Sequence, residues 1–391
     1  MMIPGLKNPK NKERIAVVAI GYNRLKGLAR LLGSVNDAVY DIPDVPLFIS
    51  IDASGDQKLY EYVRAFEWTH GPKYVNIQQE RLGLKNHIFQ CMSLSKYFKG
   101  VIILEDDIFV SPYFYHYACM ALDKYGDDER VAGIALYRNE YDGYSNVPFQ
   151  PLSYGQDVMA WKSVCSWGEM LNERMWNQFS TWLSAWDENF ADIDMNETIK
   201  GWSRAWSKYF YAYLVEADKY FIFPFESLTT NFNDAGGEHG GGESIVQVCL
   251  QQSRRNYQLA DFEDLVHYDI YGNNEDIYKW LNLESKELAI DYYIHPRKYY
   301  GRFILTPASL PYKKIRGFTL AMRPWELNVK YGLEGNELFL YDRESSEPVN
   351  APRRSFSFTF LSYYFGRYKK HFSIMFAINN YVKRIKAKIG K

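Results

Sequence analysis

Several features that would identify other classes of protein are scarce or missing in this chain of 391 residues. It has four cysteines, which are widely spaced and form no CxxC pair: Cys91, Cys119, Cys165 and Cys249. This spacing argues against a zinc site or a disulfide framework and is typical of reduced thiols in the cytosol. No window approaches about 18 uninterrupted apolar residues, and the first residues lack an apolar stretch of signal-peptide length. We therefore expect a cytoplasmic protein.

Acidic residues are absent after Glu347, whereas ten lysines and arginines lie between Pro348 and Lys391. The overall net charge of −1 hides this asymmetry, because residues 1–347 hold 36 basic and 47 acidic residues, a net charge of −11. The end of the chain, 372–391, has apolar residues on one helical face: Ile374, Ile378, Tyr381, Ile385 and Ile389. This pattern predicts a helix lying on an anionic membrane surface, peripheral on the inner face of the plasma membrane. A helix that docks on the protein body by the same face is the alternative.

Short apolar runs alternate with stretches of helical periodicity through the first 125 residues. The expected strands are 14–22, 45–52, 74–79 and 101–110, and the expected helices are 25–35, 57–68, a segment ending near 98, and 112–125. This alternation predicts a Rossmann-like α/β fold, a mostly parallel sheet with helices on both faces. We expect a catalytic domain over 1–260 and a basic, aromatic C-terminal extension over 261–391.

The expected strand 101–110 runs from branched apolar residues directly into three acids, Glu105, Asp106 and Asp107. Unpaired buried charge is costly, so these carboxylates need a cationic partner. Ligands of open α/β sheets bind outside the carboxyl ends of the strands, and clustered hard oxygens suit a metal ion carrying a diphosphate. Strand alternation would place Glu105 and Asp107 on one side and Asp106 on the other. The stretch predicts a metal–nucleotide site, with an acidic, solvated turn as the alternative.

Further candidate binding residues follow the other expected strands. They are Gly21, Tyr22, Asn23 and Arg24 after the first strand, Asp52 after the second, and Lys85 and His87 after the third. The carboxyl ends of strands in a doubly wound sheet share one crevice. We therefore expect these residues to lie at one site with the three acids.

A glycine-rich segment follows the strand expected at 220–224. Five glycines in the seven residues 236–242 make its backbone flexible or force positive φ values. Such a loop approaches a ligand or closes over it, and we expect 233–243 to close over a bound donor. A surface loop without a role is the alternative.

The segments VVAIGYNR, FISIDASGD, ERLGLKNHI and VIILEDDIFVSPYFY resemble the sugar-nucleotide-binding half of glycosyltransferases with the A-type fold. The resemblance is to inverting N-acetylglucosaminyltransferases of animal N-glycan synthesis and to bacterial polysaccharide transferases with the same EDD motif, and covers roughly residues 14–242. It implies that Asp107 binds Mn²⁺ (or Mg²⁺), which bridges the two phosphates of a UDP-sugar. It also places Glu105 and Asp106 near the ribose and the donor sugar.

The resemblance assigns the remaining nucleotide contacts in the same way. It places Asp52 by the uracil or ribose and Arg24 by the nucleotide. Lys85 or His87 would lie by the pyrophosphate or base.

The catalytic base stays open, because relatives have Trp-Asp where this chain has Trp206-Ser207. The remaining carboxylates to consider are Asp187, Asp192, Asp194, Asp234 and Glu238. A related bacterial GxEH pattern favours Glu238 and His239, and His239 either completes the metal shell through a neutral ring nitrogen or is a solvent-exposed loop residue. Our candidates are Glu238, Asp234 and Asp194 for catalysis, and Asp107 and His239 for the metal.

The expected function is a metal-dependent, inverting hexosyl- or N-acetylhexosaminyltransferase. It would move a sugar from a UDP-sugar to a hydroxyl of a glycan or lipid-linked oligosaccharide, with no nucleic acid as partner. One alternative is a nucleotidyltransferase of sugar-nucleotide synthesis, although no GxGxR-type phosphate loop lies near the N-terminus. The other is a catalytically inactive glycan-binding protein on the same fold.

Overall fold

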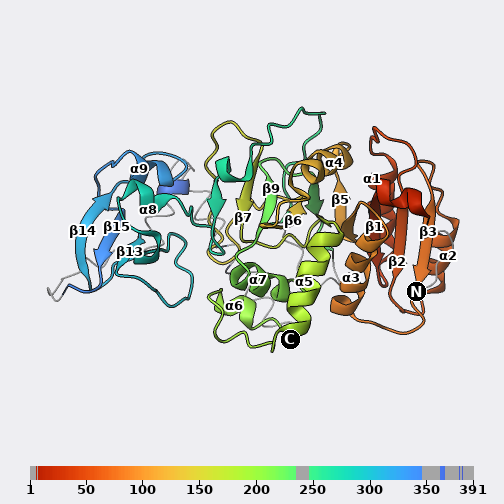
Figure 1. The fold of residues 1–391 in the computed structure, drawn as a ribbon, viewed down its shortest axis with the longest axis horizontal. Coiled ribbons are helices and arrows are strands. Elements are labelled where there is room, and N and C mark those ends of the chain that lie inside the picture. Colours follow the sequence, from red (N-terminus) through yellow and green to blue (C-terminus); the bar gives the residue numbers. More distant parts are fainter. Residues whose placement is uncertain are drawn as a thin grey trace.

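The structure is a computed structural model that describes residues 6, 8–234, 246–345, 362–365, 378 and 381. Within these residues the main element is a nine-stranded sheet in the order β11-β7-β9-β6-β8-β4-β1-β2-β3 (Figure 1). Its strands are β1 (Ile15–Gly21), β2 (Leu47–Ile51), β3 (Lys73–Ile77), β4 (Gly100–Glu105), β6 (Val131–Ala135), β7 (Val158–Trp161), β8 (Glu169–Leu171), β9 (Tyr220–Pro224) and β11 (His267–Tyr268). Five of its eight pairings are parallel. The predicted mostly parallel α/β fold is thereby confirmed.

The helices connect these strands. They are α1 (Leu25–Asn36), α2 (Gln57–Ala65), α3 (Leu84–Met92), α4 (Phe114–Tyr125), α5 (Glu173–Ala185), α6 (Glu197–Lys200), α7 (Ser207–Glu216), α8 (Ile277–Trp280) and α9 (Glu326–Lys330). The strand order reverses at β1, because β2 and β3 lie on one side of it and β4 on the other. With right-handed crossovers, α1 and α2 therefore cover one face of the sheet and α3 the other.

Burial explains why the first elements form where the sequence predicts them. All seven residues of β1 are buried, as expected for a central parallel strand. The stripe Leu28, Leu31, Leu32 and Val35 gives α1 a fully buried face against the sheet. Two expected helices are shorter than predicted: α2 stops at Ala65, and α3 gives way after Met92 to a 3₁₀ turn, Ser93–Lys96. Between Cys165 and Trp206 the chain forms β8 and the helices α5 and α6, and α7 begins directly after Trp206.

The expected single strand over 101–110 is wrong in one respect. β4 ends at Glu105, Asp106 and Asp107 form a turn, and β5 (Ile108–Val110) leaves the large sheet. β5 pairs instead with β10 (Thr229–Asn231) in an antiparallel two-stranded sheet. The alternation expected for the three acids therefore does not apply, because two of them lie outside any strand.

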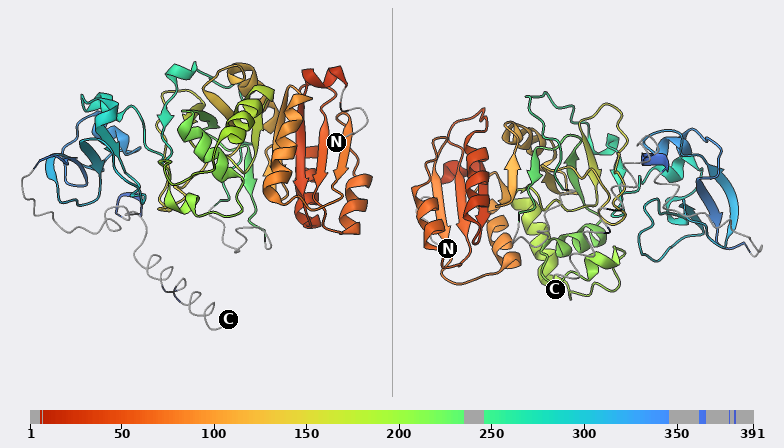
Figure 2. Two further views of the ribbon diagram at one scale, coloured as in Figure 1. Left: turned by 60° about the horizontal axis from the view of Figure 1, so that its bottom comes forward. Right: turned by 180° about the vertical axis from the view of Figure 1, so that it is seen from behind.

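A four-stranded sheet lies toward the C-terminus. Its strands, in the order in which they pair, are β12 (Leu288–Ile290), β13 (Phe303–Thr306), β15 (Leu338–Asp342) and β14 (Lys313–Phe318). Figures 1 and 2 show this part beyond the β7 end of the large sheet, at the opposite end of the molecule from β3. Tyr364 is buried there, with its hydroxyl 3.0 Å from that of Tyr292. Among the helices described here, none is sufficiently long and apolar to span a bilayer.

Candidate functional site

The candidate site lies where β1 and β4 end side by side. Ile20 and Glu105 are register partners in this parallel pair, so the loops that follow both strands leave the sheet at the same edge. Arg24 follows β1, and the Asp106–Asp107 turn follows β4. The strand order reverses at this point, which is where open α/β sheets bind ligands.

Arg24 holds the two acids of the turn. Its Nε donates to Asp106 Oδ2 at 3.2 Å, and its Nη2 donates to both Asp106 Oδ1 and Asp107 Oδ2, the latter at 3.3 Å. Burial raises the pKa of Asp106 to about 6, although the charge of Arg24 acts in the opposite direction. One guanidinium therefore faces two carboxylates, and the turn keeps an excess of negative charge.

A second pair of acids lies directly behind the turn. Burial raises the pKa of Glu105 to about 8, and the charges of Asp107 and Asp106 add to the effect. Glu169, on the neighbouring strand β8, is only 1% exposed, and its two carboxyl oxygens have no hydrogen-bond partner in the part of the chain described. Burial, with a contribution from Glu105, raises the pKa of Glu169 well above its usual range. Glu105 therefore keeps its proton at neutral pH, and burial favours the protonated form of Glu169 as well.

Trp206 links this acid pair to α7. Its indole Nε1 donates to Glu105 Oε1 at 3.4 Å. Ser207, the first residue of α7, is buried beside it. The structure therefore places Trp206-Ser207 near the site, without an acid at that position.

Asp52 organises one wall of the crevice through backbone contacts. Its carboxylate accepts hydrogen bonds from the backbone amides of Ala53 at 2.9 Å, Leu82 at 2.8 Å and Gly83 at 3.0 Å. Gly83 precedes α3 with φ of +74°, a left-handed conformation that favours glycine. Asp52 is 4% exposed, so its first role in this structure is to fix the start of α3 against the end of β2.

The other predicted binding residues divide between the crevice and the core. The guanidinium carbon of Arg81 lies over the ring of Tyr22, 4.7 Å from its centroid. Lys85 donates to the hydroxyl of Tyr209 on α7 at 3.1 Å. Asn23 is exposed, whereas Gly21 is buried at the end of β1.

His87 lies in the core. Its Nε2 is 2.7 Å from the hydroxyl of Ser50 on β2. Burial lowers its pKa to about 4, so the ring is neutral at physiological pH. The structure places this imidazole against the sheet, where it packs, and Lys85 remains the more accessible of the two predicted phosphate contacts.

Among the catalytic candidates, Asp234 lies beside the acidic turn. The residue after β10, Phe232, donates its backbone N–H to the carbonyl of Asp107 at 2.8 Å. Arg30 on α1 binds the carboxylate of Asp234 through both terminal nitrogens, Nη1 at 3.2 Å. A Cβ on Gly27 would lie 2.6 Å from the carbonyl oxygen of Asp106 and 3.4 Å from Asp234 Oδ2. The β5–β10 pairing thus brings Asp234 next to the turn.

Asp194 lies in a different environment. It accepts hydrogen bonds from Arg297 at 2.9 Å and from the Tyr271 hydroxyl at 2.7 Å, and no contact with the acidic turn is found in the described part of the chain. Glu238, His239 and most of the segment 233–243 lie outside the described residues. Their predicted roles therefore stay predictions.

The donor chemistry of the turn suits a cation shared with a substrate. No group of three or more His, Cys, Asp and Glu residues that could hold a metal ion occurs among the residues described. Mg²⁺-type sites in nucleotide-binding proteins commonly use one or two carboxylates together with substrate phosphates and water. Asp107, 16% exposed in its side chain, provides such a carboxylate at the crevice.

Some residues of the site could not be anticipated from the sequence. Glu169 is one acid within the short run WGEML and has no spacing that distinguishes it. Arg30 and Asp234 are far apart in the chain, so their pairing depends on β10 joining β5. Trp206 is identified by the resemblance, but its bond to Glu105 follows from the placement of α7.

Comparison with known proteins gives distant structural similarity. No protein-family model and no curated protein matches the chain. Among solved structures, S. aureus TarS (residues 1–349) in complex with UDP-GlcNAc is similar with 14% identity and a TM-score of 0.36, over 58% of this chain and 60% of that 1–349 chain. Mannosyltransferase PcManGT from Pyrobaculum calidifontis, in complex with GDP-Man and Mn²⁺, is similar with 13% identity and a TM-score of 0.30, over 47% and 50% of the two chains. Each similarity thus spans less than two thirds of the known protein.

Proposed function

We propose that the protein is a glycosyltransferase that takes its sugar from a nucleotide-sugar, a UDP-sugar in our assignment. The observation that supports this most strongly is the Asp106–Asp107 turn with Arg24, at the point where the strand order reverses. An open α/β sheet binds nucleotides at this point, and the turn combines hard oxygens with a cationic side chain. The resemblance in the segments around β1, β2 and β4 supports the same assignment.

In this proposal the donor lies across the β1–β4 crevice. Asp107 holds the divalent cation, Mn²⁺ or Mg²⁺, with His239 as a further candidate ligand, and Arg24 and Lys85 lie along the nucleotide and its phosphates. A bound cation supplies positive charge for the departing diphosphate. Asp52 holds the wall against which the nucleoside packs, through the backbone amides of Leu82 and Gly83.

The transfer step needs a carboxylate that accepts the proton of the acceptor hydroxyl. As that proton leaves, the hydroxyl oxygen bonds to the anomeric carbon, and the bond from this carbon to the diphosphate oxygen breaks. Each of the two carboxylates is paired with an arginine, Asp234 with Arg30 and Asp194 with Arg297, but Asp234 fits this role better because it lies beside the turn. Glu238 remains a second candidate. A base on the face opposite the leaving group makes the reaction inverting.

The acceptor is proposed to be a glycan or a lipid-linked oligosaccharide at the membrane surface. Ile378 and Tyr381, the two described residues near the C-terminus, are 58% and 67% exposed, which leaves their apolar surface available to a bilayer. We also propose that 1–260 is the catalytic domain and 261–391 the extension, in an enzyme of the cytoplasm attached to the inner membrane face.

The experiment is an incubation of the full-length protein with single sugar nucleotides, including UDP-N-acetylglucosamine and GDP-mannose, with Mn²⁺ or with EDTA. We expect one UDP-sugar to release UDP in Mn²⁺, and release to stop in EDTA. If the protein binds nucleotide but releases none from any donor, with or without added glycans, the inactive glycan-binding protein is favoured. The buried Ser207 is the structural argument for that alternative. Release of pyrophosphate from a nucleoside triphosphate and a sugar phosphate would identify a nucleotidyltransferase.

A further inference from the structure

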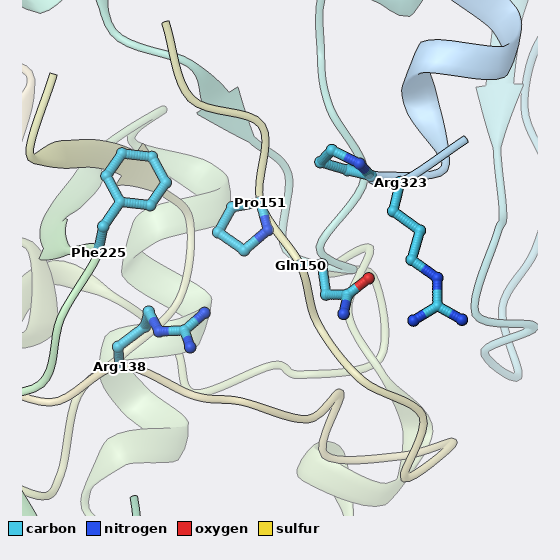
Figure 3. Close-up of a pocket in the computed structure, with 6 residues that line it drawn as sticks. Arg138, Gln150, Pro151, Phe225 and Arg323 are labelled. Atoms are coloured by element: carbon cyan, nitrogen blue, oxygen red, sulfur yellow. The ribbon is translucent and has the colours of Figure 1, made fainter. Parts of the chain in front are cut away.

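A second site lies along the same edge of the large sheet, away from the acidic turn. A cavity of about 360 Å³ is lined by Arg138, Gln150, Pro151, Phe225, Arg323 and Pro324 (Figure 3). The strands β4 and β6 are both antiparallel to β8, and β9 is parallel to β6, so β4, β6 and β9 all run in one direction. Arg138 follows β6 and Phe225 follows β9 directly. Both therefore lie at the edge where the acidic turn follows β4, but in the other half of the sheet.

The cavity carries a positive charge on Arg138 that a single ion pair, with Glu140, compensates weakly. The side chain of Arg138 is 20% exposed, and the acid in contact with it, Glu140, lies at 3.8 Å, too far for a hydrogen bond. Burial lowers the pKa of Arg138, which means that its surroundings compensate the charge poorly, although a guanidinium stays protonated at neutral pH. A buried charge in this situation favours the arrival of an anion.

Two further polar groups face the same space. Arg323 donates to the backbone carbonyl of Tyr363, lies over the ring of that tyrosine at 4.9 Å, and remains exposed. The buried Oε1 of Gln150 has no hydrogen-bond partner in the described part of the chain. Figure 3 shows the Gln150 amide between the guanidinium groups of Arg138 and Arg323 in that view. The cavity thus combines two cationic donors with a free hydrogen-bond acceptor.

We propose that this cavity binds the acceptor through an anionic sugar, one that carries a phosphate or a carboxylate. Arg138 and Arg323 bind the anionic group, because guanidinium groups form strong, charge-assisted hydrogen bonds to phosphate and carboxylate oxygens. Gln150 Oε1 accepts a hydrogen bond from a sugar hydroxyl, and Phe225 with the two prolines provides apolar surface for the ring. The inference rests on the proposed glycosyltransferase function and adds the chemical class of its acceptor.

The test is a calorimetric titration of the full-length protein with glucose 6-phosphate, glucuronate, glucose and inorganic phosphate. We expect at least one charged sugar to bind about tenfold or more tightly than glucose, and the better of the two identifies the anionic group. Arg138→Gln and, separately, Arg323→Gln should each weaken that binding about tenfold. The matched control is Arg64→Gln, at an exposed residue of α2, which should change nothing. Arg323 is itself exposed, so its variant tests the site even where Arg138→Gln affects folding.

Equal binding of glucose and the charged sugars would overturn the inference, and so would unchanged binding in both arginine variants. Inorganic phosphate binding as tightly as glucose 6-phosphate would also overturn it, because the cavity would then be a simple anion site. UDP with Mn²⁺ is titrated into the same proteins. Absence of sugar-anion binding in the unmodified protein, with UDP binding intact, contradicts this inference alone, whereas absence of UDP binding in the unmodified protein contradicts the proposed function.

Discussion

Replacing Glu169 with glutamine should make the stability of the protein less dependent on pH. Glu169 is 1% exposed, both of its carboxyl oxygens lack hydrogen-bond partners in the described part of the chain, and Glu105 lies close enough to raise its pKa further. Glutamine keeps the shape of the protonated acid and cannot ionise. The variant therefore removes one proton-binding group from the core and leaves the packing of β8 in place.

The direction of the effect follows from the raised pKa. The folded protein holds this proton more tightly than the unfolded chain, so the stabilisation is fully present below the unfolded pKa, about 4.3 for glutamate, and is lost as pH rises through the folded value. Between the unfolded and the folded pKa, a carboxyl of this kind reduces the free energy of unfolding by about 1.4 kcal/mol for each pH unit of increase. Between about pH 5.5 and 7.5, Glu169→Gln should therefore lose less stability than the unmodified protein, by at most about 2.7 kcal/mol, the limit for a group that stays protonated across both pH units.

The assay is urea unfolding in EDTA at the two pH values, followed by tryptophan fluorescence. Glu61→Gln is the control, because Glu61 is an exposed residue of α2. Its pH dependence should match that of the unmodified protein. Parallel pH dependence in Glu169→Gln and the unmodified protein would show that Glu169 does not hold a proton in the folded state, and the reasoning from its burial would be refuted.

Three further predictions concern the site and the tail. Gly27→Ala should weaken binding of UDP with Mn²⁺ about tenfold or more, because the new Cβ would lie 2.6 Å from the carbonyl oxygen of Asp106 and displace the turn. The control is Gly33→Ala in the same helix, whose Cβ meets nothing within 4 Å, and this variant should bind UDP normally. Asp234→Asn should reduce sugar transfer by about a hundredfold or more while UDP binding is kept, and Asp194→Asn should not; equal rates in the two variants would exclude Asp234 as the base. Removing 353–391 should abolish flotation with phosphatidylglycerol vesicles at low salt, since each basic residue near such a surface contributes about 1 kcal/mol; unchanged flotation would favour the docked tail.

Much of the first half of the fold is predictable because local patterns decide it. The buried stripe of α1 and the apolar run of β1 appear in the sequence at the periods of a helix and a strand. Parallel strands joined by helices then bring Arg24 and the acids after β4 to one edge of the sheet, which sequence reasoning also anticipates.

The parts that the sequence does not reveal depend on contacts between distant segments. The turn at Asp106–Asp107 forms because β5 pairs with β10, more than a hundred residues later, and the same pairing places Asp234 by Arg30. His87 follows the third strand like Lys85, yet its position on α3 turns it toward Ser50 in the core. The cavity between Arg138 and Arg323 joins residues after β6 to a loop near the four-stranded sheet, so no local pattern indicates it.

In the proposed function the turn after β4 holds a metal-bound nucleotide, and a calorimetric titration of UDP is the direct test. The unmodified protein should bind UDP in Mn²⁺ and much more weakly in EDTA. Asp107→Asn should lose the Mn²⁺-dependent part while its thermal unfolding stays unchanged. The matched control Asp123→Asn, at an exposed residue of α4 that pairs with Lys99, should bind as the unmodified protein does. UDP affinity in Asp107→Asn equal to that of the unmodified protein, with the same response to Mn²⁺, would contradict the claim.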